Sequence, residues 1–306
     1  MRPLKFHPIL KQTLWGGERI IPYKELASGL SRVGESWELS GMPGSESVVA
    51  EGPWAGSTLS ELIGRFGAEL LGKANYARFG QEFPLLVKFI DAREDLSIQV
   101  HPDDELARKR HGKSGKCEMW YVLEAEPGAS LLTGFSRPIA PAEYERRVAD
   151  NTLTDVLNRQ AIASGDVFYL PAGRVHSIGK GSFIVEIQQS SDITYRIYDF
   201  DRRDAAGNSR ELHTELAREA IDFESSENSR ITYAPENNQE VRLVTTPYFT
   251  TSLYTLTART RCDWSATDSF VAIVLLQGSG SLTDNEGNRI DVRQGETWLL
   301  PASTQW

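Results

Sequence analysis

Several residue types are scarce in this 306-residue chain, and each scarcity excludes a class of protein. The only two cysteines, Cys117 and Cys262, cannot build a disulfide framework and lie too far apart for a C-x-x-C motif, as is typical of a reducing compartment. No apolar run approaches the roughly 20 residues that a transmembrane helix needs. The first residues contain no apolar signal-peptide core. We therefore expect a soluble, cytoplasmic protein without membrane contact.

Positive charge is also in deficit. The 33 Lys and Arg residues against 42 Asp and Glu residues give a net charge of -9. A general nucleic-acid binder needs a basic surface to displace counterions, so nucleic acid is not an expected partner. A few local cations can still bind one small anion. The composition is that of a globular protein, and the length allows two domains, while the oligomeric state is left open.

Histidine is scarce as well, and two of the five histidines lie in motifs. Gln99 and His101 are two residues apart in a strand-like run, so their side chains should project from one face. Glu118 begins another such run, and a Gly- and Pro-containing turn leads to His176. Imidazole, carboxylate and amide groups are ligands of zinc and related divalent metals. These four residues predict a metal site, in which Gln99 is either a ligand or a hydrogen-bond partner of one.

The rest of the chain is typical of many short strands separated by turns. Strands are predicted at 85–90, 96–101, 118–123, 166–170 and 182–188, and residues 242–306 are again dense in strand patterns. In residues 1–80 one helix is predicted after Thr58, which forms a capping-box pattern with Glu61. A second helix is predicted over about 141–157, starting at a proline. Residues 199–240 are charged and are interpreted as loop.

An internal repeat defines the expected architecture. Gly165–Ala172 (GDVFYLPA) is echoed by Gly295–Ala302 (GETWLLPA), and the ungapped repeat puts Trp306 where the first copy has His176. Short strands, Gly/Pro turns and a repeated unit predict an all-β-dominated fold of two jelly-roll barrels. Residues 1–230 would form an N-terminal segment and a metal-binding barrel with the helical insertion, and residues 231–306 a barrel without metal. Since no strand follows Trp306, either the sequence is truncated or this barrel closes differently.

Two levels of family resemblance follow from these motifs. The run ending at His176 resembles the second signature motif of the cupin superfamily. The Q-x-H-P-D-D motif at 99–104, Lys116-Cys117-Glu118 and Thr194-Tyr195-Arg196 resemble the type I phosphomannose isomerases, in the short form without the large helical insertion. The resemblance extends from Leu14 to Arg202. It implies one zinc ion per chain on the four ligands named above, Arg196 as the catalytic arginine, and interconversion of mannose 6-phosphate and fructose 6-phosphate.

Such a reaction moves a proton between C1 and C2 through an enediol, which requires a base and a cation near the developing enediolate. Arg196, pointing into the barrel, would stabilise the negative charge. It is expected to share its strand face with Thr194 and Tyr198. Glu186 lies where a glutamate lines the family's pocket, and is either an acid/base group or a structural partner of Arg196. Glu186, Lys116 and a zinc-bound water all remain candidates for the base.

The phosphate of such a substrate also needs cations and hydrogen-bond donors. Ser97 should share a strand face with Gln99, and Lys116 with Glu118. Arg202 is a second candidate cation by resemblance, although its charged surroundings are equally typical of a solvated turn. The set predicted to bind the phosphosugar is Ser97, Lys116 and Arg202, with Lys88 as a further candidate.

Two other functions fit part of the pattern. An iron-dependent cupin oxygenase would use the same ligand types, but the cations at 116, 196 and 202 favour a phosphosugar. A non-catalytic sugar-phosphate sensor or storage cupin is compatible with a degenerate second barrel, but the complete ligand set and Arg196 favour an enzyme. Trp15 is interpreted as a core residue. The remaining histidines are interpreted as surface or packing residues, namely His7, His111 and His213.

Overall fold

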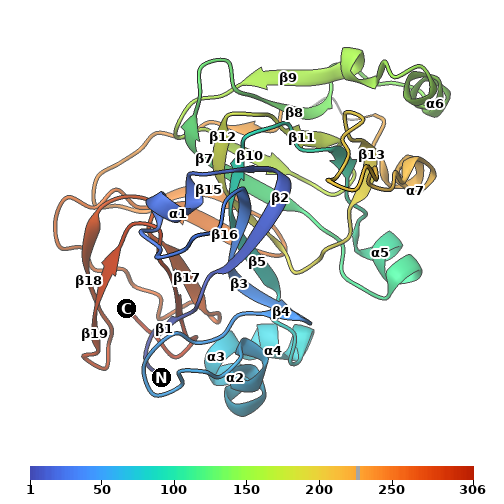
Figure 1. Cartoon of the computed structure of the whole chain (residues 1–306). Coiled ribbons are helices and arrows are strands. Elements are labelled where there is room, and N and C mark those ends of the chain that lie inside the picture. The colour runs from blue at the N-terminus through green and yellow to red at the C-terminus, as the bar shows by residue number, and fades with distance from the viewer. Residues whose placement is uncertain (225–227) are drawn as a thin grey trace.

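The computed structural model describes residues 1–224 and 228–306 and is mainly β-sheet (Figure 1). All pairings between its named strands are antiparallel, and seven short α-helices lie within the described ranges. Among these residues, no helix combines the length and apolar character required to cross a membrane. The predicted predominance of β-structure is thus confirmed.

Two antiparallel sheets lie face to face and enclose the largest part of the polar interior. The eight-stranded sheet runs β14 (Arg230–Ile231), β10 (Val167–Leu170), β7 (Glu118–Ala125), β12 (Ser182–Gln189), β5 (Leu85–Ala92), β2 (Ile9–Gly17), β3 (Val33–Met42) and β4 (Ser45–Glu46). The five-stranded sheet runs β13 (Tyr195–Tyr198), β6 (Ile98–Val100), β11 (His176–Ile178), β8 (Ser130–Phe135) and β9 (Leu157–Ala161). Their facing sides share one apolar cluster, which includes Ile90, Trp120, Phe168, Leu131 and Ile178.

Smaller sheets are formed largely by the C-terminal quarter of the chain. They are β1 (Leu4–Lys5), β20 (Thr297–Leu300) and β17 (Val271–Val274); β15 (Val241–Thr245) and β16 (Thr250–Leu253); and β18 (Ser279–Thr283) and β19 (Arg289–Arg293). β1 pairs with β20 through Leu4 and Leu299, so the first strand of the chain joins the last. A separate apolar cluster centred on Val292, Trp298 and Leu300 lies among these strands.

The helices cover the sheets rather than separate them. They are α1 (Ile20–Tyr23), α2 (Leu59–Phe66), α3 (Ala68–Leu71), α4 (Lys73–Phe79), α5 (Asp104–His111), α6 (Pro141–Ala149) and α7 (Thr214–Ala220), with a 3₁₀ turn at Leu153–Val156. The predicted capping box holds the start of α2, where Thr58 Oγ1 accepts the Glu61 N–H and Glu61 caps the Thr58 N–H. α2 buries Leu59, Leu62 and Ile63 in the core, because this spacing places them on one helix face.

Three sequence predictions about secondary structure need correction. One helix is predicted in residues 1–80, but α1 precedes it and two more helices follow it, because Gly67 and Gly72 adopt positive φ and divide the later segment into α2, α3 and α4. The helix predicted to reach residue 157 ends at Ala149, shortly before Asn151 adopts a φ of 54°. The stretch 199–240, interpreted as loop, contains α7 and β14; its residues 225–227 lie outside the described ranges.

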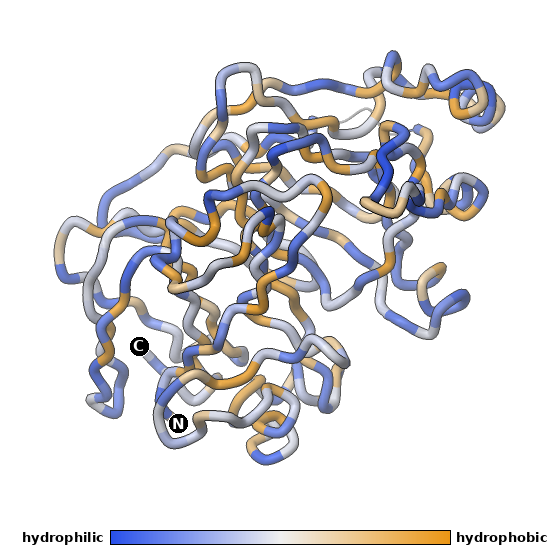
Figure 2. Tube along the Cα trace, in the orientation of Figure 1, coloured by the Kyte–Doolittle hydropathy of each residue, from blue (hydrophilic) through white to orange (hydrophobic). Residues whose placement is uncertain are grey.

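Hydrophobic segments gather at the centre of the molecule, and the outer turns are mostly hydrophilic (Figure 2). The interior between the two large sheets has an apolar part and a polar part. Its apolar part contains Trp15, which is 4% exposed and therefore a core residue as predicted. Beyond the apolar part, the same strand faces carry buried charged and polar side chains, and these form the candidate site.

Candidate metal centre and the cations around it

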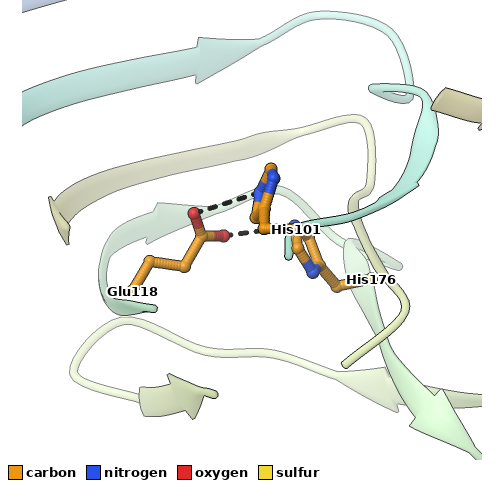
Figure 3. A group of neighbouring side chains, drawn as sticks. All are labelled: His101, Glu118 and His176. Carbon is orange, nitrogen blue, oxygen red and sulfur yellow. Dashed lines mark ion pairs between the residues drawn. The ribbon is translucent and has the colours of Figure 1, made fainter. Parts of the chain in front are cut away.

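Three ligand-capable side chains from both large sheets converge in the interior. His101 directly follows β6, Glu118 begins β7 and His176 begins β11. One ligand atom from each lies within 4.8 Å of the others. Glu118 Oε1 is 3.2 Å from His176 Nε2, and Oε2 is 3.5 Å from His101 Nε2. Figure 3 shows the carboxylate facing both imidazole rings. Three of the four residues predicted as metal ligands therefore lie close enough together to share one ion, namely His101, Glu118 and His176.

Strand register and one glycine fix this convergence. His176 lies directly opposite Gln99 on β6, and Glu118 lies opposite Leu170, the last residue of β10. The turn from β10 to β11 contains Gly173 at a φ of +85°, and its N–H donates to the His101 carbonyl at 2.9 Å. A Cβ at this position would lie 3.0 Å from a backbone oxygen, so the close approach favours glycine.

The cluster is removed from solvent, and burial sets its protonation. Glu118 is fully buried, and each imidazole is 2% exposed. Burial, together with Lys116, lowers the pKa of His101 to about 3, and burial also lowers the pKa of His176. Burial alone would raise the pKa of Glu118, but Lys116 and the two imidazole groups outweigh it and hold this pKa well below its usual range. Neutral imidazole and ionised carboxylate are the forms that bind metals.

The hydrogen bonds of the two rings orient a lone pair toward Glu118. His101 Nδ1 is 2.8 Å from the Ile193 carbonyl, and His176 Nδ1 is 2.8 Å from the Arg174 carbonyl. Because a carbonyl only accepts, each Nδ1 must carry the ring proton, which leaves each Nε2 as an acceptor. This second hydrogen bond is the arrangement that fixes metal-binding histidines.

The Nε2 acceptors of the two histidines therefore face the carboxylate oxygens of Glu118, which are also acceptors, in a buried site. His101 Nε2 and both Glu118 oxygens lack a hydrogen-bond partner in the described part of the chain, although Lys116 Nζ lies 3.1 Å from Glu118 Oε2. Each such buried atom costs about 1–3 kcal/mol when unpaired. A cation among these atoms would satisfy them all, so the residues fit a divalent metal with nitrogen and oxygen ligands.

Gln99 and Ser97 lie at the edge of this cluster, on the strand face that their spacing predicts. Gln99 Nε2 is 3.3 Å from His176 Nε2, and Gln99 Oε1 accepts a hydrogen bond from Ser97 Oγ at 3.3 Å. Gln99 thus touches a ligand-capable histidine while its oxygen is held by a serine.

Arg196 belongs to the same face of the five-stranded sheet. Arg196, Gln99, His176 and Thr133 lie opposite one another on successive strands, so their side chains share one face. The register shifts by one residue after Arg196, which places Tyr198 opposite Ile98. The predicted shared face of Arg196 and Tyr198 is therefore wrong, because a β-bulge interrupts the alternation.

A second row of side chains crosses the eight-stranded sheet. Trp37, Lys88, Glu186 and Trp120 are successive cross-strand partners. Glu186 accepts hydrogen bonds from Lys88 Nζ and Trp120 Nε1, both at 2.9 Å. The Trp120 ring contacts the His176 ring at 5.4 Å between centroids. Glu186 is therefore adjacent to the metal cluster, but its partner is Lys88 rather than the predicted Arg196.

Arg202 lies beside the entry to β6. Its Nη2 donates to the Asp95 carbonyl and lies 3.6 Å from Asp199 Oδ1. The Arg202 side chain is 10% exposed, which excludes the alternative of an ordinary solvated turn for this residue. Lys88, the further candidate for binding the phosphate, instead forms an ion pair with Glu186.

Several neighbours of the predicted residues had no sequence signal. His213 was interpreted as a surface or packing residue, but its Nδ1 accepts the Arg196 N–H at 3.2 Å. Asp199 and Arg210 form a further ion pair near Arg196. These contacts join positions 11 to 17 residues apart within an irregular segment, where no periodicity indicates which side chains meet.

Comparison with known proteins gives consistent results. The sequence profile of the phosphomannose isomerase type I catalytic domain matches residues 4–132. The chain is 34% identical to mannose-6-phosphate isomerase ManA of Bacillus subtilis (98% of this chain, 93% of the relative). It is 33% identical to the mannose-6-phosphate isomerase of Streptococcus mutans (98% and 92%).

Solved structures show the same similarity. The crystal structure of the mannose 6-phosphate isomerase from Bacillus subtilis has a TM-score of 0.86 at 29% sequence identity, covering 100% of this chain and 95% of the other. A mutant of phosphomannose isomerase from Salmonella typhimurium has a TM-score of 0.78 at 16% identity, with 99% and 95% covered. At that identity the second likeness concerns the fold alone.

Proposed function

The chain belongs to the type I phosphomannose isomerases, and from this premise we propose that it interconverts mannose 6-phosphate and fructose 6-phosphate with the help of one zinc ion. The observation that carries the metal is the buried set of facing acceptor atoms on His101, Glu118 and His176. A pure sugar-phosphate binder has no need of such a site. The enediol route is the proposed chemistry.

The proposed zinc ligands are His101, Glu118, His176 and Gln99. The Gln99 amide becomes a suitable ligand after a half-turn, which exchanges Nε2 and Oε1 at the cluster. This rotation breaks the hydrogen bond from Ser97, whose hydroxyl is then available to a substrate. When bound, zinc supplies positive charge that polarises oxygen atoms of the substrate.

Arg196 and Glu186 are the proposed catalytic side chains. Arg196 shares a strand face with the cluster, and its guanidinium would stabilise charge developing on a substrate oxygen. Glu186 is held by Lys88 and Trp120 and retains further lone pairs, so we assign it the proton transfer. Lys116 Nζ lies 3.1 Å from Glu118 Oε2, and this pairing supports a role as a cation rather than as the base.

The proposed phosphate ligands are Ser97, Lys116 and Arg202. Ser97 precedes Gln99 on the same strand face, and Arg202 bonds to the carbonyl of Asp95, two residues before Ser97. Arg202 Nη1 is buried and lacks a hydrogen-bond partner among the described residues, which leaves a donor for an anion. A dianionic substrate would therefore meet donors from the start of β6 and from the segment that follows β13.

The wider setting is also a proposal. We assign the metal to a first jelly-roll barrel of the cupin type, within residues 1–230, and a metal-free second barrel to residues 231–306. A cytoplasmic location and the lack of a nucleic-acid partner follow from the scarcity of cysteine and from the net charge of -9.

Turnover of mannose 6-phosphate before chelation, after chelation and after zinc restoration tests this function. We expect about one zinc per chain by mass spectrometry, loss of turnover on chelation, and recovery with zinc. Full turnover by the metal-free protein would contradict the metal dependence. Binding without turnover would indicate a sensor, and oxygen uptake with iron an oxygenase.

A further inference from the structure

We propose that Asp199 and Arg210 are a pair of positioning residues that hold the guanidinium of Arg202 in place for the substrate phosphate. This inference rests on the proposed function, because it explains how one of the proposed phosphate ligands is fixed. Neither residue belongs to the set assigned above to metal, catalysis or substrate.

The Asp199 carboxylate lies between two guanidinium groups. It is 5% exposed, and it accepts hydrogen bonds from Arg210 Nε at 2.8 Å and from Arg210 Nη2 at 2.5 Å. The same carboxylate lies 3.6 Å from Arg202 Nη2. A two-pronged pairing of this kind restricts orientation more strongly than a single contact. Arg210 therefore fixes the carboxylate, and the carboxylate in turn restrains Arg202.

Arg202 and Arg196 each retain one guanidinium nitrogen without a partner among the described residues. Arg202 uses Nη2 for the Asp95 carbonyl, and Arg196 uses Nη1 for the Glu211 carbonyl at 2.8 Å. Arg202 Nη1 and Arg196 Nε are buried and have no partner within the residues that the structure describes. Burial and then the charge of Arg210 lower the pKa of Arg196, so the guanidinium groups of Arg196 and Arg210 lie close enough to repel one another.

The charge balance of this group favours an anion. Three guanidinium groups, those of Arg196, Arg202 and Arg210, lie near the buried carboxylate of Asp199, and the exposed carboxylate of Glu211 also acts on Arg196, so positive charge is in excess. A phosphate monoester carries a charge of about -2 near neutral pH. Guanidinium groups are suited to phosphate because their fixed N–H directions match two oxygens at once.

The backbone between Asp199 and Arg202 is strained in a way that serves this contact. Phe200 and Asp201 adopt φ values of 54° and 52°, in the left-handed region that residues other than glycine rarely occupy. The resulting turn lets the Arg202 N–H donate to the Asp199 carbonyl at 3.1 Å. It thereby returns the Arg202 side chain to the Asp199 carboxylate. Strain of this kind persists where the surrounding contacts enforce it.

The decisive variant is Asp199→Asn, which preserves shape and removes the charge. We expect KM for mannose 6-phosphate and the dissociation constant of inorganic phosphate to rise about tenfold, the scale of one charge-assisted contact. We expect kcat and metal content to change less than about twofold. Calorimetry with inorganic phosphate measures binding without turnover, and thermal unfolding verifies that the variant folds.

Two further variants separate positioning from general loop stability. Arg203→Gln is the matched control, because Arg203 is in the same loop and donates to Gly207 within that loop; phosphate binding should not change. In an Arg202→Gln background, Asp199→Asn should have little further effect, because Asp199 acts through Arg202.

The outcomes distinguish this inference from the proposed function. The protein could bind phosphate in a way that depends on Asp199 and yet fail to isomerise mannose 6-phosphate. That result would support the positioning pair and contradict the proposed function. Unchanged phosphate affinity in Asp199→Asn, or a full effect that persists without Arg202, would overturn the positioning pair even in an active isomerase. Lack of phosphate binding by the wild-type protein would overturn it as well.

Discussion

The chain builds the same strand and turn twice, at Gly165–His176 and at Gly295–Trp306, and the two copies agree in individual hydrogen bonds. The Gly165 N–H donates to the Val122 carbonyl, and the Gly295 N–H to the Leu275 carbonyl, both at 2.8 Å. β10 covers residues 3–6 of the first copy, and β20 covers the same positions of the second. The repeat in the sequence is therefore a repeat in three dimensions.

Even the strands that flank the two copies are equivalent. In the first copy, Arg230 on β14 pairs with Asp166 at 2.5 Å and lies over the Phe168 ring at 4.8 Å. In the second copy, Lys5 on β1 pairs with Glu296 at 2.5 Å and lies over the Trp298 ring at 5.5 Å. The cation that covers the aromatic ring thus follows the repeat in the sequence in the first copy (Arg230) and lies far before it in the second (Lys5).

The copies differ where the candidate metal ligands lie. Glu118 is the cross-strand partner of Leu170, whereas Val271 is the partner of the equivalent Leu300. The position of His176 is taken by Trp306, whose ring is stacked against Arg261 at 4.2 Å. The equivalent positions therefore carry a polar cluster in the first copy and apolar side chains in the second. Glu118 and His176, two of the proposed metal ligands, have no ligand-capable counterpart in the second copy.

The largest effect expected from this comparison concerns the last residue of each copy. His176→Ala should reduce both bound metal and turnover by more than the 10–100-fold that loss of an outer-shell partner typically causes. Trp306→Ala, the equivalent change in the second copy, should alter turnover by less than about twofold. Metal analysis and a coupled isomerase assay measure both. Equal losses in the two variants would refute the proposed difference between the copies.

A second prediction contrasts two buried ion pairs. Lys88–Glu186 lies beside the metal cluster, while Lys24 bonds to Glu38 at 2.9 Å and to the Gly295 carbonyl of the second copy. Glu186→Gln should lower kcat per folded molecule about 100-fold or more if this residue transfers the proton, and it should also destabilise the protein, because the buried Lys88 ammonium loses its counter-charge.

Lys24→Met should lower stability without lowering kcat, because it leaves Glu38 buried without its partner and neither residue is among the proposed catalytic side chains. We expect a loss of about 3–5 kcal/mol in the free energy of unfolding, with kcat per folded molecule unchanged. Denaturant unfolding and initial rates on the same preparations separate the two effects. A large loss of kcat in Lys24→Met would connect the second copy directly to the chemistry.

The smallest effect is expected at the contact between the C-terminal segment and the Q-x-H-P-D-D motif. Tyr248 donates to Asp104 Oδ2 at 2.9 Å, and Tyr248→Phe should cost about 1 kcal/mol of stability. Burial alone would raise the pKa of Asp104, but bonds from Gly115, Tyr248 and Gln189 lower it. The stabilisation is therefore present above the unfolded pKa of about 4 and is lost as the pH falls through the lower native pKa. Unfolding curves of both proteins from pH 3 to 7 should converge at the acidic end; a constant gap would contradict this.

Sequence patterns predicted the parts of the structure that depend on local chemistry. The spacing of Gln99 and His101, the alternation in the strands and the repeat of Gly165–Ala172 are each visible within a few residues. They sufficed for the main strands, the core position of Trp15, and the convergence of His101, Glu118 and His176.

Contacts set by register between distant strands could not be predicted in this way. Lys88 meets Glu186 because β5 and β12 pair in one particular register, and the residues are 98 positions apart. The bulge after Arg196 shifts every later residue of β13 by one, and no sequence alternation indicates where a bulge falls. Asp199 and Arg210 meet in an irregular segment whose path depends on Phe200 and Asp201 in an unfavourable conformation.

The pairing of β1 with β20 has a consequence for folding during synthesis on the ribosome. Leu4 is synthesised 295 residues before its partner Leu299. At roughly 5–20 residues per second, the first strand would wait tens of seconds for its neighbour. During that time, its hydrogen-bonding edge and the apolar face of Leu4 have to be kept from other nascent chains. This pairing can thus form only once β20 has been synthesised, so the edge of β1 stays without that partner while the intervening residues are made.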